Sequence, residues 1–225
     1  MSVVIAPRAF FFDFDGVIVD SENVHMAAAL AASETHDVIF SREYYYDVLL
    51  GYDDVGLFQK LWSDKGLTLS SGELKNLLKI KTRAFLDLIR KHVIFFDGVT
   101  HLIARLHALN IPLAIVSGAL RKEIKICLEA GDLSQYFQFI VAADDVEFSK
   151  PHPESYQKAF GLMQKKIPDL QASECWCIED SPAGIQSARG AKLNVLGITN
   201  SVKASDLVDA HHIIAHYDEL SLDKA

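Results

Sequence analysis

The stretch AFFFDFDGVIVDS, residues 9–21, decides the fold, because a short apolar run meets a group of acids there. Such a run, bounded by a turn signal, is typical of a buried strand. Residues two apart in a strand face the same side, so Asp13 and Asp15 can converge on one point at its carboxyl end. A plain turn or one arm of a calcium loop also uses Asp-x-Asp-Gly. The apolar strand before it and the lack of further loop ligands argue against calcium.

Beyond residue 98 the pattern alternates between short apolar runs and helical spacing. We expect strands at 112–117, 139–142, 175–178, 195–198 and 213–215, and helices at 101–109, 121–130, 154–163 and 182–189. Strands that alternate with helices favour right-handed crossovers and a parallel sheet. The fold class predicted is therefore α/β, with a doubly wound, Rossmann-like core.

Residues 21–95 have a different texture, with helical spacing and few strand signals, most clearly at 25–33, 55–65 and 73–90. Because the first strand precedes this block, we interpret it as an insertion. The prediction is a core formed by residues 1–20 and 96–225 and an all-helical cap formed by 21–95. The three adjacent tyrosines at 44–46 are expected to pack inside the cap, because aromatic side chains usually serve packing.

Composition excludes several classes of protein. Half of the 225 residues are hydrophobic, so a core can be buried, and the net charge of -8 without a basic block argues against a nucleic-acid partner. No apolar stretch reaches the roughly 18 residues of a membrane span, and the first residues lack the features of a signal peptide. A disulfide framework is improbable, because the number of cysteines is small and odd: Cys127, Cys175 and Cys177. We expect a cytoplasmic monomer, with Cys175 and Cys177 buried in a strand.

Three further strand ends carry polar groups. Ser117 and Gly118, before a helix, suit an anion cradle, although Ser-Gly is also an ordinary loop. Lys150 could neutralise a phosphate, or could be a solvated loop lysine. Glu179 and Asp180 could cap the next helix, or could complete an oxygen site for Mg²⁺ with the acids of the first strand.

Together these segments resemble the haloacid dehalogenase (HAD) superfamily, over essentially the whole chain. The order of the segments is more specific than any one of them. Within this superfamily, the chain is most similar to the β-phosphoglucomutase-like branch. The first motif reads Asp13-x-Asp15-Gly-x-x-x-Asp20-Ser21, and the further motifs lie at Ser117, Lys150 and Glu179-Asp180.

The resemblance implies a mechanism for phosphate transfer. Asp13 would attack phosphorus and form an aspartyl-phosphate. Asp15 would protonate the leaving oxygen and then activate water. The resemblance places Mg²⁺ between Asp13, the Asp15 carbonyl and Asp180, with Glu179 as a candidate fourth contact. Dehalogenases of the family lack the second aspartate, so Asp15 favours phosphate chemistry.

The resemblance also implies how the substrate would be held. Ser117, the Gly118 backbone and Lys150 would bind the phosphoryl oxygens. The cap would close over the site and select the substrate. In the cap, His25 falls where the mutases carry a hinge-side histidine and Lys81 lies near their substrate-binding lysine, so both are candidate substrate contacts. His25 could equally be an exposed helix residue, and Lys81 a solvated one.

A phosphatase acting on a small phosphorylated metabolite, such as a sugar phosphate, is the favoured function. Mutases of the branch carry an arginine shortly after a cap glycine, whereas Gly51 is followed here by Tyr52, Asp53 and Asp54. Leu120 stands where a mutase has a lysine that contacts phosphate. A β-phosphoglucomutase-like phosphomutase remains the alternative, and a catalytically idle phosphate-binding protein is a third hypothesis.

Overall fold

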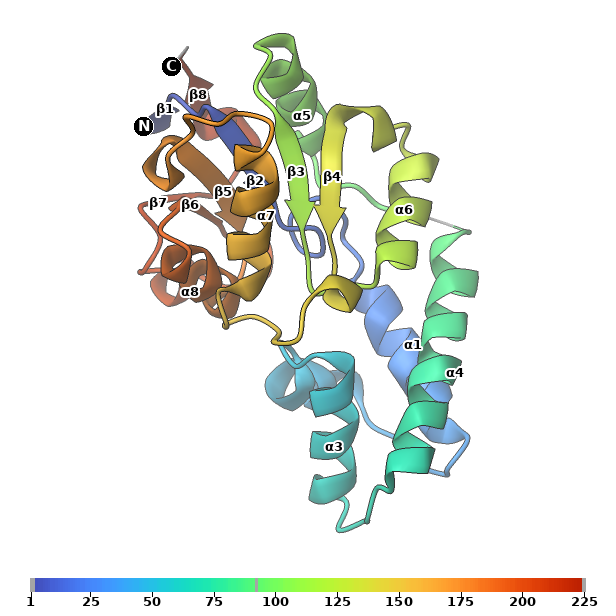
Figure 1. Ribbon diagram of the computed structural model, residues 1–225. Helices are drawn as coiled ribbons and strands as arrows, with labels where there is room; N and C mark the ends of the chain where they lie inside the picture. The colour runs from blue at the N-terminus through green and yellow to red at the C-terminus, as the bar shows by residue number, and fades with distance from the viewer. Residues whose placement is uncertain (1–2, 92, 224–225) are drawn as a thin grey trace. The chain divides into compact units, whose positions relative to one another are not determined.

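The computed structural model describes residues 3–91 and 93–223 and divides the chain into two compact units (Figure 1). One unit comprises Met1–Asp20 and Val93–Ala225, and the other comprises Ser21–His92. The second boundary expected from the sequence lies between residues 95 and 96. Each unit is described by itself below.

A six-stranded sheet forms the centre of the first unit, which we call the core unit. Every pair of neighbouring strands is parallel, so all carboxyl ends lie at one edge. The α/β class with a parallel sheet is therefore confirmed. The spatial order is β4 (Phe137–Val141), β3 (Leu113–Val116), β2 (Ala9–Phe12), β5 (Cys175–Glu179), β6 (Asn194–Ile198) and β7 (His212–Ile214).

Four α-helices of the core unit connect these strands, and each lies within two residues of its predicted bounds. They are α5 (Val99–Ala108), α6 (Arg121–Ala130), α7 (Glu154–Gln164) and α8 (Pro182–Gly190). Short 3-10 turns complete the connections: η2 (Ser134–Tyr136), η3 (Ala143–Asp145), η4 (Ala172–Glu174), η5 (Ala204–Asp206) and η6 (Tyr217–Glu219). A second, two-stranded parallel sheet, which was not predicted from the sequence, is formed by β1 (Val3–Ile5) and β8 (Leu220–Leu222).

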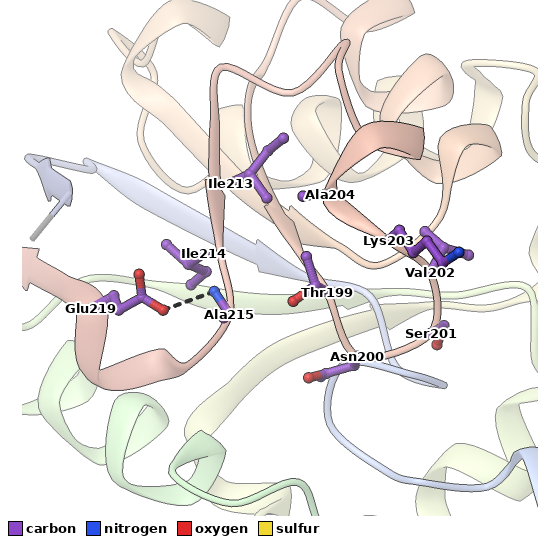
Figure 2. Close-up of a pocket in the computed structure, with 10 residues that line it drawn as sticks. All are labelled: Thr199, Asn200, Ser201, Val202, Lys203, Ala204, Ile213, Ile214, Ala215 and Glu219. Atoms are coloured by element: carbon purple, nitrogen blue, oxygen red, sulfur yellow. Dashed lines mark hydrogen bonds between the residues drawn. The ribbon is translucent and has the colours of Figure 1, made fainter. Parts of the chain in front are cut away.

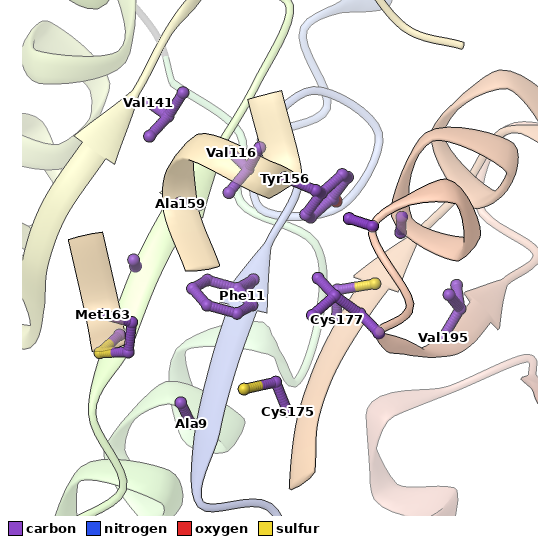
Figure 3. Packing of buried hydrophobic residues seen from close by; sticks show 14 of the residues in the cluster. Ala9, Phe11, Val116, Val141, Tyr156, Ala159, Met163, Cys175, Cys177 and Val195 are labelled. Carbon is purple, nitrogen blue, oxygen red and sulfur yellow. The ribbon is translucent and has the colours of Figure 1, made fainter. Parts of the chain in front are cut away.

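Strand β2 is buried on both faces, as a central parallel strand must be. Phe11 packs in a cluster with side chains of α7, among them Tyr156, and with Cys177 of β5 (Figure 3). Phe10 and Phe12 alternate to the opposite face. Cys175 lies in the same cluster as Cys177 and both thiols are free, which confirms the prediction of buried strand cysteines.

The second unit, which we call the cap unit, is helical, as its sequence texture predicts. It contains α1 (Glu22–Glu34), α2 (Arg42–Tyr44), the π-helical turn η1 (Tyr45–Leu49), α3 (Asp54–Asp64) and α4 (Ser71–Ile89). Tyr45 belongs to its hydrophobic core, and Tyr44 and Tyr46 pack against that core. Within residues 3–91 and 93–223, no helix is long and apolar enough to cross a membrane.

Two helical glycines give a matched test of the core packing. A Cβ at Gly184 in α8 would lie 1.7 Å from Oε2 of Glu179, whereas a Cβ at Gly161 in α7 would have no heavy atom within 4 Å. We expect Gly184→Ala to lower the free energy of unfolding by about 1–3 kcal/mol through overpacking. Gly161→Ala should raise it by about 0.5–1 kcal/mol, since alanine favours the helix. Urea denaturation of both variants measures the difference, and equal stabilities would refute the close approach.

Candidate active site

Three carboxylates meet where β2 and β5 end. The backbone N–H of Asp13 donates to the carbonyl of Ile178 over 3.1 Å, which sets Asp13 beside the end of β5. Glu179 is the last residue of that strand, and Asp180 follows it. One carboxylate oxygen from each of the three residues lies within 4.8 Å of the others, and all three residues are buried. Adjacent parallel strands thus bring together acids that are more than 160 positions apart in the sequence.

Lys150 lies against this acidic cluster. Its Nζ donates to Oδ1 of Asp13 over 2.9 Å and to Oε1 of Glu179 over 2.7 Å. A third bond of 3.0 Å reaches the carbonyl of Val116, the last residue of β3. The side chain is only 12% exposed, so it is not the solvated loop lysine that the sequence also allowed. One ammonium group therefore connects the ends of β3, β2 and β5.

Tyr156 supports the same corner of the site from α7. Its hydroxyl donates a short hydrogen bond to Oε1 of Glu179, and its ring centroid lies 5.2 Å from Nζ of Lys150. The sequence analysis did not single out this tyrosine. Tyr156 lies on the apolar face of α7 with Ala159 and Met163, so its spacing predicts a core residue. That spacing does not indicate that its hydroxyl hydrogen-bonds to Glu179.

The ionisation of the cluster reflects its burial. Burial and then the charge of Asp13 raise the pKa of the Glu179 carboxyl well above its ordinary value. The same two causes raise the pKa of Asp180 to about 7. Burial lowers the pKa of Lys150, but the charges of Asp13 and Glu179 outweigh it and hold that pKa above its ordinary value. The ammonium is therefore charged at neutral pH, whereas the carboxylates repel one another.

The donor set fits a divalent cation. Three carboxylates against one ammonium leave two negative charges uncompensated when all the groups are ionised. Oε2 of Glu179 is buried and has no hydrogen-bond partner among the described residues, a costly state for a carboxylate oxygen. Carboxylate oxygens are the ligands that hard cations such as Mg²⁺ prefer. The acidic cluster could therefore hold a metal ion.

The loop after Asp13 needs a glycine. The carbonyl of Phe14 accepts from the N–H groups of Ile18 and Val19, which folds the chain back tightly, and Asp15 forms a β-bridge with Val19. Gly16 has a φ of +76°, and a Cβ there would lie 1.7 Å from Oδ2 of Asp180. The Asp-Gly turn signal thus marks a close approach to the acidic cluster.

Ser117 and Gly118 continue directly from the carbonyl that binds Lys150. Ser117 is buried, and its Oγ accepts from the backbone N–H of Ala119 over 3.0 Å. Gly118 is exposed, and a Cβ there would meet nothing within 4 Å. Both residues lie at the same sheet edge as the acidic cluster, with open space beside Gly118.

His25 and Lys81 belong to the cap unit, where they contact each other. Nζ of Lys81 lies 2.8 Å from Nδ1 of His25 and 2.8 Å from Oδ1 of Asp54. The His25 ring stacks on Phe85 at a centroid distance of 4.4 Å. Lys81 is only 2% exposed, so its charge is already compensated within the cap unit by Asp54.

One residue that lines an open depression of the core unit (Figure 2) bonds to the acidic cluster. That residue is Ser201, which donates a short hydrogen bond to Oδ2 of Asp180. No pattern in the sequence marked Ser201. The depression is lined by Thr199, Asn200, Ser201, Val202, Lys203, Ala204, Ile213, Ile214, Ala215 and Glu219.

The raised pKa of Asp180 predicts how stability depends on pH without a divalent cation. The folded protein binds the Asp180 proton more tightly than the unfolded chain does, because the pKa is about 7 in one and near 3.8 in the other. This stabilisation is complete below about pH 4 and is lost as the pH rises to about 7. In EDTA, the free energy of unfolding of the wild type should therefore fall between pH 4 and pH 8.

Asp180→Asn removes this titration, so the pH dependence of its unfolding should be weaker by about 1.4 kcal/mol for each unit of the pKa shift. Urea denaturation at several pH values measures it, with the exposed Asp209→Asn as control. Parallel pH profiles for the wild type and Asp180→Asn would contradict the shift.

Comparison with known proteins places these motifs in one family. The family model described as haloacid dehalogenase-like hydrolase matches residues 10–198. The protein CbbY of Rhodobacter capsulatus is 31% identical over 199 residues, which is 84% of each chain. The phosphorylated carbohydrates phosphatase of Thermotoga maritima is 23% identical over 204 residues, 87% of each chain. These relatives support the predicted class of enzyme, a phosphoric monoester hydrolase.

A solved structure shows the same fold. The β-phosphoglucomutase of Clostridium difficile superposes with a TM-score of 0.79 at 23% identity, covering 96% of this chain and 93% of that chain. At this identity the likeness concerns the fold and leaves the choice between hydrolysis and isomerisation to the residues themselves.

Proposed function

This chain belongs to the haloacid dehalogenase-like hydrolase family, and on that premise we propose that it is a Mg²⁺-dependent phosphatase of small phosphorylated metabolites, sugar phosphates in particular. The observation that carries the proposal is the contact of Lys150 with Asp13 and Glu179, beside Asp180. With all four groups ionised, this buried cluster has an excess of two negative charges, which a divalent cation would balance before a phosphate approaches. A phosphorylated carbohydrate is the substrate class named for one relative.

In the proposed reaction, Asp13 supplies the nucleophilic oxygen. It forms a bond to phosphorus while the bond from phosphorus to the alcohol oxygen of the substrate breaks, which gives an aspartyl-phosphate. Asp15 gives its proton to the departing oxygen. It then takes a proton from water as the water oxygen attacks phosphorus, so that inorganic phosphate leaves and Asp13 is restored. When bound to the acidic cluster, Mg²⁺ would supply positive charge that stabilises the phosphoryl oxygens.

Lys150 has two tasks in this proposal. Its bond to Oδ1 of Asp13 orients the nucleophile, and its charge stabilises the phosphoryl oxygens as they change geometry. Ser117 and the backbone of Gly118 would bind the same oxygens from the end of β3. We propose Asp13, Asp180, the Asp15 carbonyl and Glu179 as metal contacts. Oε1 of Glu179 already accepts from Lys150 and Tyr156, so Oε2 is the atom it would offer.

Two contacts favour hydrolysis over isomerisation. A mutase must hold a second phosphate, which requires further uncompensated positive charge. In the core unit, the Arg121 guanidinium binds Asp145 and the carbonyl of Ile140. In the cap unit, Lys81 pairs with Asp54. Arg121 and Lys81 are therefore already paired with carboxylates of the chain itself. We keep His25 and Lys81 as proposed substrate contacts, with Lys81 as a donor whose charge Asp54 shares.

The nucleophile is tested by Asp13→Asn. With p-nitrophenyl phosphate and a panel of sugar phosphates, the wild type should release phosphate with Mg²⁺ but not with EDTA. The variant should lose about a thousand-fold or more in kcat, as single removals of a nucleophile do. Its circular dichroism and urea midpoint check that it folds. Full Mg²⁺-dependent turnover in Asp13→Asn would contradict the aspartyl-phosphate. Absence of turnover in the wild type would favour the idle or mutase hypotheses.

The reaction type is tested by the products. With glucose 1-phosphate and a bisphosphate primer, a phosphatase yields inorganic phosphate in proportion to the substrate consumed, whereas a mutase yields an isomeric sugar phosphate without net release. We expect net release. Asp15→Asn should lower kcat by about 10²–10⁴-fold, the usual worth of a general acid–base, and should still bind Mg²⁺ by titration calorimetry. An isomeric product without phosphate release would overturn the proposal.

A further inference from the structure

The segment after β6 contacts the acidic cluster from a side on which the motifs place no residue. Ser201 donates through Oγ to Oδ2 of Asp180, and the carboxylate of Asp180 is almost fully buried. Gly16 also lies close to that oxygen, since a Cβ there would be 1.7 Å from Oδ2 and 2.7 Å from Oγ of Ser201. The Ser201 hydroxyl and the backbone of Gly16 therefore both limit the positions that Oδ2 can take.

Other contacts of this segment hold Ser201 in place independently of Asp180. Nδ2 of Asn200 donates to the carbonyl of Gly16 over 2.8 Å and to the Tyr217 hydroxyl over 3.2 Å. The Tyr217 hydroxyl in turn donates to the carbonyl of Val17. Asn200 and Tyr217 thus tie the segment to the loop that follows Asp13. These bonds hold the chain next to Ser201 without using the hydrogen bond that Ser201 makes to Asp180.

Ser201 is exposed and lines the open depression together with its neighbours from Thr199 to Ala204, which Figure 2 draws as sticks. Because the residue is exposed, we expect loss of its hydroxyl to cost little in global stability. An effect of Ser201 on metal binding would therefore be separable from an effect on folding.

We propose that Ser201 is a positioning residue of the metal site, which acts by orienting the carboxylate of Asp180. This inference rests on the proposed function, since it gives Asp180 the role of a metal ligand. A hydrogen bond that orients a ligating carboxylate commonly changes metal affinity by 10–100-fold when it is removed. The expected defect of a Ser201 variant is a higher dissociation constant for Mg²⁺, with little change in turnover once the site is saturated.

The test compares Ser201→Ala, Ser201→Thr and Ser205→Ala in the full chain. Ser205→Ala is the matched control, because that exposed hydroxyl lies on the same segment and contacts only Asp206 among the described residues. Titration calorimetry with Mg²⁺ and with Mn²⁺, without substrate, gives the metal affinity. The Mg²⁺ dependence of phosphate release gives kcat at saturation, and urea denaturation in EDTA gives the stability of the metal-free protein.

Ser201→Ala should raise the Mg²⁺ dissociation constant about tenfold, keep kcat at saturating Mg²⁺ within about twofold, and leave metal-free stability nearly unchanged. Ser201→Thr, which keeps the hydroxyl, should restore the affinity, and Ser205→Ala should match the wild type. Unchanged affinity in Ser201→Ala, in a wild type that binds Mg²⁺ and releases phosphate, would overturn this inference and leave the proposed function intact. A loss of stability that Ser201→Thr does not rescue would indicate a structural role and also overturn it. A wild type that neither binds the metal nor releases phosphate would overturn both.

Discussion

The contact of one buried ammonium group with two of three buried carboxylates is the constraint on which the rest of the core unit depends. Lys150 bonds to Asp13 and Glu179 at 2.9 and 2.7 Å, in surroundings where an unpaired charge is costly. The group brings the ends of β2, β3 and β5 together at one point, because each contributes an acceptor to the same Nζ. With all of these groups and Asp180 ionised, two negative charges remain uncompensated, and the proposed divalent cation would balance them.

Two glycines make room for the acidic cluster. At Gly16 and Gly184 a Cβ would lie 1.7 Å from a carboxylate oxygen of Asp180 and Glu179 respectively. A side chain at either position would displace the carboxylate oxygen that lies against the glycine. The two glycines are therefore part of the site's geometry, although they carry no reactive group. The loop after Asp13 and the first turn of α8 are thereby packed directly against the carboxylates.

The cap unit contains a second buried cation with a different balance. Lys81 meets Asp54 at 2.8 Å, lies beside His25 and has its ammonium 5.3 Å from the Phe85 ring centroid. One acid compensates this lysine, whereas the acids around Lys150 exceed its charge. The contrast bears on the proposed chemistry, since a divalent cation could balance the acidic cluster, whereas the Lys81 ammonium already has a carboxylate partner. A second phosphate would find little free positive charge at either Lys81 or Arg121.

The sequence by itself determined the alternation of strands and helices, because apolar runs and helical spacing are local signals. It therefore also determined that Asp13, Ser117, Lys150 and Glu179 would follow strands that end at one sheet edge. Only the tertiary structure decided the partners of these groups. From the sequence, Tyr156 is predicted to be a core residue and Ser201 a loop residue. The short strands β1 and β8 could not be predicted, because only their pairing with each other defines them. Hydrogen bonds between residues far apart in the chain produce no periodic pattern in the sequence, whereas the spacing of apolar residues within a segment predicts a strand or a helix.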